Sequence, residues 1–494
     1  MAASPPLHRR TGPRWATLLL LVGVVVTSVH ARTLQRAPPT TPSPGGPVLG
    51  IETVILPGAT ALAWRGPFGR AARVEGEGRF EVWRAPLWSG RPTELRAEDA
   101  DIAAATFVVD HPLNAGESVA AAWAAAPLLY GIGFVALLGG MLFDGAVWHA
   151  TVLALLLGGV RALSPAWGLD SDPARYWQSA LDILAGGLPD PLWPPAWALA
   201  LVPAAAWGDP VAGRLFGVAL FGICPALAAR VSGPGRAGVA AAVLTAASFE
   251  GVGFAPSLYS ETLFVTLGLA FLAVPGSLPG GLLAAAGALT RVHALLVFPL
   301  VAWARGGLTR MLFVLLVPVV LWSAVVSAGE GRMILISDNG GMNLWIGHRP
   351  GADGDWHEPG PPPLEGYGPA ALAAIRADPA AAMRRVVGNV GRLWNASRSD
   401  RTLATRPLGL PLVPFVVLVL LAVVGGWAPR RGVPSTGALV MWLVATTMVT
   451  AVFFAPVRYK LGLYPALLPL GGRGLGFLIE RAGAAVRRGV TVRG

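Results

Sequence analysis

Two aspartates have the residue type and the position that proton transfer requires. Asp170 and Asp172 precede a helical stretch in which Tyr176 lies one turn beyond Asp172. A carboxylate can take a proton from a hydroxyl group, so this pair is a candidate for general-base catalysis. The same spacing also fits two ordinary loop carboxylates, with Asp172 as the N-cap of a helix that begins at Pro173.

Two further charges interrupt apolar sequence. Glu261 starts an apolar run directly after Tyr259 and Ser260, and Arg291 with His293 separates GLLAAAGALT from ALLVFPLVAWA. Each of these two runs is too short to cross a bilayer of about 30 Å at about 1.5 Å per residue. We therefore expect two half-length helices that meet at a polar break, which a membrane permits only where the break is buried in protein or lines a wet cavity.

Each of these side chains has a functional and a structural interpretation. Arg291 is suited to an anionic headgroup, or alternatively forms a salt bridge with Glu261. Glu261 is either a functional carboxylate or one that favours the N-terminus of its helix. His293 is expected as a hydrogen-bonded spacer, because the sequence contains no HExxH motif or His/Asp cluster that would make it a metal ligand.

Arg458 and Lys460 lie close together between two apolar runs, in APVRYKLGL. Alternate threading of the apolar runs places this very short segment on the outer side, where positive charge is least expected, and this inversion indicates an anionic partner. A lipid phosphate would satisfy both cations through charge-assisted hydrogen bonds. Snorkelling of both side chains to the membrane surface is the alternative.

The composition indicates whether the chain folds in water or in a membrane. Of 494 residues 54% are hydrophobic and 13% are charged, against about 25% charged in a soluble domain. This excludes an ordinary soluble enzyme and favours a mostly α-helical, polytopic membrane protein of roughly 11 to 13 transmembrane helices. The single cysteine, Cys224, excludes intramolecular disulfides and cysteine metal sites.

The net charge of +11 is largely a topology pattern. Short arginine-bearing segments fall on one side when the apolar runs are threaded alternately, which makes that side cytoplasmic and leaves nucleic-acid binding without support. The expected spans are 119–141, 146–163, 209–229, 237–256, 261–276, 309–328, 408–427, 436–455 and 461–479.

The predicted organisation combines these spans with outer segments, among them a small N-terminal extracytoplasmic β domain whose short β-like stretches are separated by Gly/Pro turns. Its parts are a signal anchor or signal peptide (1–31), the β-rich domain (32–118), a transmembrane core (119–328) with a first outer loop (164–208), an extracytoplasmic domain (329–406), C-terminal transmembrane helices (407–480) and a basic cytoplasmic tail (481–494).

Five short blocks stand in order over roughly 146–480: GLDSDPARYWQSALDILAGG with PLWPPAWALALVPAAAWGD, LYSETLFVTLGLAFL, LLAAAGALTRVHALLVFPLV, DNGGMNLWIGHRPGADG and RYKLGLYPALLPL. Together they resemble bacterial members of the glycosyltransferase-C superfamily, which are related to protein O-mannosyltransferases and aminoarabinose transferases. The chain departs from the family pattern at Val292, where Pro is common, and at His348, where Asn is common. These departures bear on the identity of the sugar and the acceptor more than on the type of reaction.

The resemblance implies an inverting transferase in the plasma (inner) membrane, with its active site facing the periplasm or cell exterior. The donor is a polyprenyl-phosphate sugar, and the acceptor is a lipid, a glycan or a protein. Asp172 is the implied base, with Asp170 second, and the implied substrate-binding residues are Tyr176, Glu261, Arg291, Arg458 and Lys460. No cofactor is required, although the resemblance does not exclude a divalent metal.

Two other classes of protein share some of these features. A polytopic transporter would have many spans and a broken helix, together with an internal repeat that we do not find in this sequence. A non-catalytic subunit for the export or assembly of a lipid-linked glycan would use the outer segments for binding, and would need no carboxylate near the cations.

Overall fold

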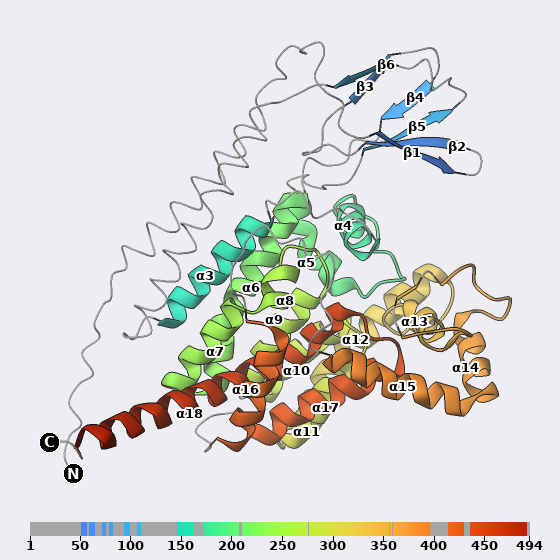
Figure 1. The fold of residues 1–494 in the computed structure, drawn as a ribbon. Coiled ribbons are helices and arrows are strands. Elements are labelled where there is room, and N and C mark those ends of the chain that lie inside the picture. The colour runs from blue at the N-terminus through green and yellow to red at the C-terminus, as the bar shows by residue number, and fades with distance from the viewer. Residues whose placement is uncertain are drawn as a thin grey trace. The chain divides into compact units, whose positions relative to one another are not determined.

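In the computed structural model the chain is mostly helical (Figure 1). The structure describes residues 146–162, 171–206, 210–274, 276–354, 356–357, 359–395, 413–428 and 435–491, and the backbone of six strands between Ile51 and Val109. The predicted signal segment 1–31, the predicted span 119–141 and Asp170 lie outside these described residues.

The chain divides into a larger unit, mainly 134–158 and 172–494, and a smaller one, 13–133 with 159–171. The helices are α3 (Ala146–Ala162), α4 (Ser171–Leu184), α5 (Pro195–Ala205), α6 (Pro210–Ser232), α7 (Arg236–Ala246), α8 (Phe249–Phe254), α9 (Glu261–Ala273), α10 (Ser277–Thr290), α11 (Ala294–Ala304), α12 (Leu308–Glu330), α13 (Asn339–His348), α14 (Tyr367–Ala377), α15 (Pro379–Trp394), α16 (Phe415–Trp427), α17 (Thr436–Val452), the 3-10 helix η2 (Val457–Leu463) and α18 (Tyr464–Thr491).

The smaller unit contains six short strands. One antiparallel sheet has the order β1 (Ile51–Leu56), β2 (Ala59–Trp64), β5 (Thr93–Glu98), β4 (Arg79–Val82), and a second pairs β3 (Ala72–Glu75) with β6 (Thr106–Val109).

In the larger unit, long-range packing joins segments that are far apart in sequence. α18 packs against both α16 and α7, α6 against α7 and α9, and α11 against α17. Local sequence sets several helix ends. Ser435 caps α17 by accepting a hydrogen bond from the Ala438 amide, and α12 ends where Gly331 adopts a left-handed conformation with φ of 65°.

The break predicted between two half-helices is present. α10 ends at Thr290 and α11 begins at Ala294, with Arg291, Val292 and His293 between them. One expected continuous span, 237–256, is instead divided into α7 and α8, so that prediction was wrong in detail. The division leaves backbone groups between α7 and α8 without helical partners, and Val413, just before α16, bonds to two of them. Its amide donates to the Ala247 carbonyl at 2.7 Å, and its carbonyl accepts from the Phe249 amide at 3.2 Å.

The last predicted span also differs from the structure. The chain from 461 begins with the 3-10 turn η2, and α18 then continues through much of the predicted basic tail to Thr491.

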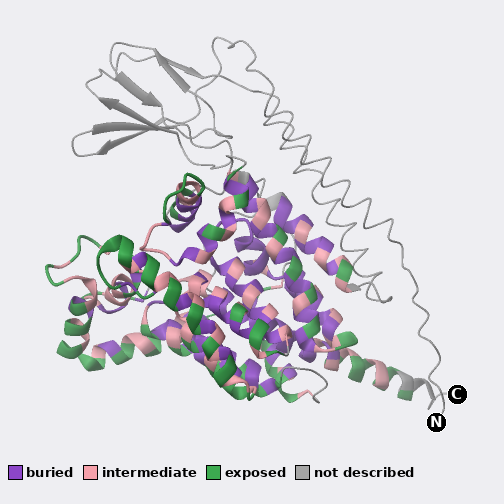
Figure 2. Cartoon of the chain, turned by 180° about the vertical axis from the view of Figure 1, so that it is seen from behind, coloured by how far each residue is buried: buried purple, intermediate pink, exposed green. Residues whose placement is uncertain are grey.

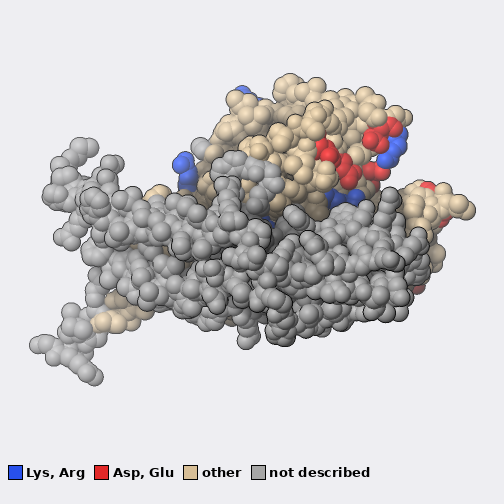
Figure 3. All heavy atoms as spheres, turned by 90° about the horizontal axis from the view of Figure 1, so that it is seen from above, with Lys and Arg blue, Asp and Glu red and all other residues tan. Residues whose placement is uncertain are grey.

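Exposed residues occur along several helices (Figure 2). Large apolar side chains are among them. On α12, Phe313 is 73% and Leu321 is 62% exposed, and Trp427 at the end of α16 is 87% exposed. Two described helices, Ala212–Ser232 and Leu308–Glu330, are long and apolar enough to cross a membrane. Charged side chains occupy few places on the described part of the face in Figure 3.

Three helices gather at one end of the bundle (α13, α14 and α15 in Figure 1). Two of them, α13 and α15, are bonded to the end of α17 by side chains. Asn389 of α15 is fully buried and donates to the carbonyls of Ala451 and Phe453, at 3.0 and 3.2 Å, and His348 Nε2 lies 2.7 Å from the Val452 carbonyl. A Cβ on Gly347 would collide with the Phe453 carbonyl, so α13 can approach α17 this closely only with glycine at that position.

Candidate active site

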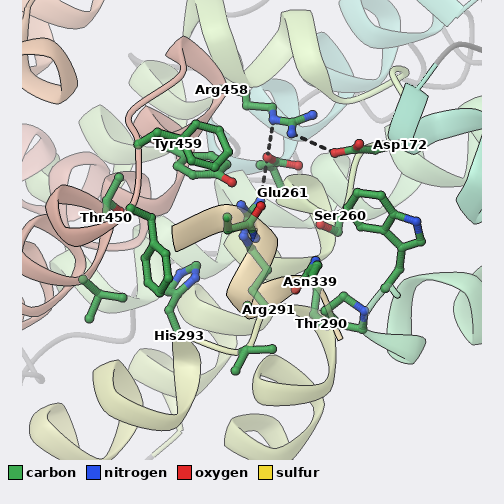
Figure 4. Close-up of a pocket in the computed structure, with 18 of the residues that line it drawn as sticks. Asp172, Ser260, Glu261, Thr290, Arg291, His293, Asn339, Thr450, Arg458 and Tyr459 are labelled. Carbon is green, nitrogen blue, oxygen red and sulfur yellow. Dashed lines mark ion pairs between the residues drawn. The ribbon is translucent and has the colours of Figure 1, made fainter. Parts of the chain in front are cut away.

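A cavity of about 380 Å³ lies where several helix ends converge (Figure 4). Its wall includes residues from α4, the N-termini of α9 and α13, the break after α10, the C-terminal end of α17 and η2. Antiparallel helices such as α9 and α10 bring one N-terminus and one C-terminus to the same end of a bundle. The polar residues that the sequence places at helix ends therefore meet here.

Four charged side chains in this cavity form a continuous chain, which we call the paired-charge cluster: Asp172, Glu261, Arg291 and Arg458. Arg458 Nη2 lies 2.7 Å from Asp172 Oδ2, and its Nε lies 3.5 Å from Glu261 Oε1. The same oxygen of Glu261 lies 2.6 Å from Arg291 Nη1. The dashed lines in Figure 4 follow this path from Asp172 through Arg458 and Glu261 to Arg291.

The cluster is largely removed from solvent. Its side chains are between 4% exposed, for Glu261, and 15% exposed, for Arg458. Because charges interact more strongly away from water, two carboxylates and two guanidinium groups at these distances neutralise one another. Burial by itself lowers the pKa of Arg458, but the Asp172 and Glu261 carboxylates outweigh it and hold that pKa well above its ordinary value. Arg458 is therefore a permanent cation.

Aromatic rings hold both guanidinium groups in place. The Arg458 guanidinium lies 4.5 Å from the ring centre of Tyr259, and that of Arg291 lies 4.6 Å from the ring centre of Tyr459. The Tyr259 backbone follows Leu258, which is the one non-glycine residue with positive φ (57°) in the described part of the chain. The Trp197 indole fixes this turn by donating to the Leu258 carbonyl at 2.6 Å.

Tyr176 lies on α4 one turn beyond Asp172 and lines the same cavity. Its side chain is buried, and its hydroxyl hydrogen-bonds to Ser260. Burial, and secondly the neighbouring Asp172 carboxylate, raise the pKa of Tyr176. The phenol therefore stays protonated beside the carboxylate and can donate a hydrogen bond.

The structure brings five of the seven predicted site residues to one cavity: Asp172, Tyr176, Glu261, Arg291 and Arg458. The structural alternative for Arg291 is also present, because it is ion-paired with Glu261. Its functional interpretation, the binding of an anionic headgroup, stays a prediction.

Lys460 is not among the residues that line the cavity, contrary to the expectation that it faces the same anion as Arg458. Its Nζ donates to the Asn395 carbonyl at 2.7 Å and lies 4.9 Å from the ring centre of Phe415. The reason is the 3-10 conformation of η2, which sends side chains two positions apart in different directions, where an extended segment would align them.

Several cavity residues were not singled out from the sequence: Trp193, Asn339, Asn343, Thr450 and Tyr459. Trp193 stands out among them, because its buried indole N–H has no hydrogen-bond partner and its ring lies against Tyr176. Three of the others follow motifs that the sequence does display: Asn339 and Asn343 flank the Gly-Gly pair, and Tyr459 follows Arg458. Thr450 carries no such pattern.

Within the described residues, no group of three or more His, Cys, Asp and Glu side chains is placed to hold a metal ion. Comparison of the chain with protein-family models and with curated proteins finds no match.

Proposed function

We propose that this protein is a multi-pass membrane glycosyltransferase that moves a sugar from a polyprenyl-phosphate carrier to an acceptor hydroxyl on the extracytoplasmic face. The observation that carries the proposal is the paired-charge cluster inside one cavity. It combines a carboxylate for the acceptor with guanidinium groups for a phosphate, in a bundle with apolar outer surfaces.

The membrane part of the proposal rests on exposure. Phe313, Val320 and Leu321 on α12 are each more than half exposed, and an apolar face of this kind is stable against lipid and unfavourable in water. The multi-pass topology and the outer orientation of the cavity follow from the threading of the expected spans.

The donor phosphate has a suitable cation in Arg458. The Nη2 atom of Arg458 is in contact with the Asp172 carboxylate. A phosphate group of the donor would therefore compete with Asp172 for the Arg458 guanidinium group. Binding of the donor would therefore release Asp172 from its ion pair. The released carboxylate is then available to accept the proton of the acceptor hydroxyl.

The reaction then balances as follows. Asp172 accepts the proton of the acceptor O–H while the acceptor oxygen forms a bond to the anomeric carbon of the sugar. The bond between that carbon and the phosphate oxygen breaks with its electron pair, which leaves polyprenyl phosphate and inverts the anomeric centre. Arg458, with Arg291 held beside it through Glu261, stabilises the negative charge that develops on the leaving phosphate.

The test uses the full-length protein in lipid nanodiscs, labelled polyprenyl-phosphate sugars and a panel of lipid, glycan and peptide acceptors. Asp172→Asn should reduce transfer by at least about 10³-fold, as expected for the loss of a general base. The matched control is Asp182→Asn on the same helix, because Asp182 bonds only to Gln178 at the exposed surface and should not affect turnover. Equal transfer by both variants would remove Asp172 as the base.

A transporter or a non-catalytic assembly subunit remains the competing function. It predicts that the wild-type protein binds the lipid-linked sugar without turnover across the whole acceptor panel.

A further inference from the structure

A second, much smaller void adjoins the cavity. Its volume is about 10 Å³, which is the space of one water-sized sphere. It is lined by Glu261 and Phe264 of α9, by Arg291 and His293 of the break, by Thr446 and Thr450 of α17, and by Tyr459 and Gly462 of η2. It therefore lies where four elements of the site meet.

Two buried polar atoms at this void lack a hydrogen-bond partner: His293 Nε2 and Thr446 Oγ1. Thr446 is 1% exposed, so its hydroxyl cannot reach bulk water. The His293 ring lies against Phe264, with 5.0 Å between ring centres, on an otherwise apolar side. An unsatisfied buried polar atom is costly and rare, and two of them on residues that line one void of this size indicate a small ligand that bonds to both.

The ligand must be an uncharged oxygen. Glu261 and Arg291, which also line the void, are already paired with each other at 2.6 Å, so no net charge remains there to attract an ion. The imidazole and the threonine hydroxyl can each donate or accept, and a water or a hydroxyl group can reciprocate with both.

We propose that this void is a binding site for one uncharged hydroxyl-type oxygen, bridging His293 Nε2 and Thr446 Oγ1. In the empty protein its source is a buried water. With the donor bound, its source is a hydroxyl group of the transferred sugar, because the void shares Glu261, Arg291 and Tyr459 with the main cavity. This second part rests on the proposed function, and the first part does not.

The consequence is a role for a residue that the mechanism does not use. The bridging oxygen ties His293, and with it the break that carries Arg291, to α17. His293 is then a positioning residue for Arg291, and it hydrogen-bonds to one hydroxyl group of the sugar.

The first arm of the test is thermal unfolding of the full-length protein without any ligand. Thr446→Val keeps the shape of the side chain and removes its hydroxyl. If the oxygen is bound, this variant loses a hydrogen bond and leaves the water short of a partner, so Tm should fall by about 2 °C. Thr446→Ser keeps the hydroxyl and serves as the matched control, and His293→Phe in the Thr446→Val background should cost less than it does alone.

An equal or higher Tm in Thr446→Val would overturn the proposal, because removing an unsatisfied hydroxyl from a dry void is neutral or stabilising. The sign of the change therefore decides, and no transferase activity is needed to read it.

The second arm measures binding of two probes, polyprenyl phosphate and polyprenyl-phosphate mannose. If a sugar hydroxyl enters the void, Thr446→Val should weaken binding of the mannosyl lipid by about tenfold and leave binding of polyprenyl phosphate unchanged. Unchanged affinity for both probes would overturn the sugar part and leave water as the occupant. Binding of neither probe to the wild type would contradict the proposed function, while the thermal arm would still decide the oxygen site.

Discussion

Arg458 is the side chain on which the paired-charge cluster depends, because it contacts both carboxylates. Breaking a buried ion pair by removing one partner leaves a buried charge uncompensated, which costs more than the pair itself contributes. Here the removal of one guanidinium group would leave Asp172 without its 2.7 Å contact and Glu261 with Arg291 alone.

We therefore expect Arg458→Gln to lower the free energy of unfolding by about 3–5 kcal/mol, measured by denaturation in detergent or nanodiscs. The matched control is Arg384→Gln on α15, whose side chain is 72% exposed and lies 3.9 Å from Asp378. That variant should stay within about 0.5 kcal/mol of the wild type. Equal stability of both variants would mean that the cluster is hydrated and weak.

Lys460 lies two residues from Arg458 but belongs to the packing between η2 and the end of α15. Lys460→Met keeps the length of the side chain and removes its bond to the Asn395 carbonyl. We expect a loss of stability of about 1–3 kcal/mol with a donor KM within a factor of about two of the wild type. The measurement is the donor KM of Lys460→Met compared with that of Arg291→Gln. A KM that rises equally in both variants would mean that Lys460 does bind the donor.

Residue types near the site could be read from the sequence because charges in apolar runs are conspicuous. The pair of Arg291 with Glu261 was also one interpretation of the sequence. The pairing of Arg458 with Asp172 and Glu261 was not predicted, because these residues come from η2, α4 and α9, and only packing of the bundle brings these three elements together. The separation of Arg458 from Lys460 was equally hidden, because it depends on the 3-10 turn of η2.

At the scale of the elements, the outer helices position the part of the chain that carries Arg458. Asn389 and His348 bond to the last carbonyls of α17, which have no partner within that helix. Phe453 and Phe454 follow directly and line the cavity. The fastening of α13 and α15 to α17 thus sets the direction in which the chain enters η2.

Asn389→Ala should therefore lower stability by about 2 kcal/mol and reduce kcat along with it. Gly391→Ala on the exposed side of the same helix is the control, because a methyl group there meets open space and should be neutral or slightly stabilising. Unfolding curves and turnover of the two variants give the comparison. A loss of stability in Asn389→Ala without a change in kcat would show that the fastening does not reach the site.

The helices themselves were largely predictable, because apolar run length and the polar break at Arg291 are local features of the sequence. The division between α7 and α8 was not, because the bonds that compensate it come from Val413, far along the chain. The distinction between a straight span and a broken one is thus a tertiary property.

Across the molecule, two of the arginines in the short segments that orient the chain have a second role. Arg230 donates to the Ala273 carbonyl, and Arg305 donates to the Phe271 and Val274 carbonyls, all at the end of α9. Cations stabilise helix C-termini in this way wherever the helix lies. The orientation of the protein therefore needs its own measurement.

Cys224 makes that measurement simple, because the only cysteine of the chain is fully buried. A membrane-impermeant maleimide should label Leu364→Cys in intact cells, since Leu364 lies in the predicted outer domain and is fully exposed. Arg310→Cys, at an exposed position at the predicted cytoplasmic end of the span 309–328, should be labelled only after the cells are opened. The reverse pattern would invert the topology.

In the proposed mechanism the donor phosphate and Asp172 compete for Arg458. Binding of polyprenyl phosphate to the Asp172→Asn variant measures this competition. Removing the carboxylate charge frees the guanidinium group, so this variant should bind polyprenyl phosphate about tenfold more tightly than the wild type although it no longer transfers sugar. Affinity that is unchanged or weaker in Asp172→Asn would contradict the account, because Arg458 would then not be the phosphate site that Asp172 occupies in the empty protein.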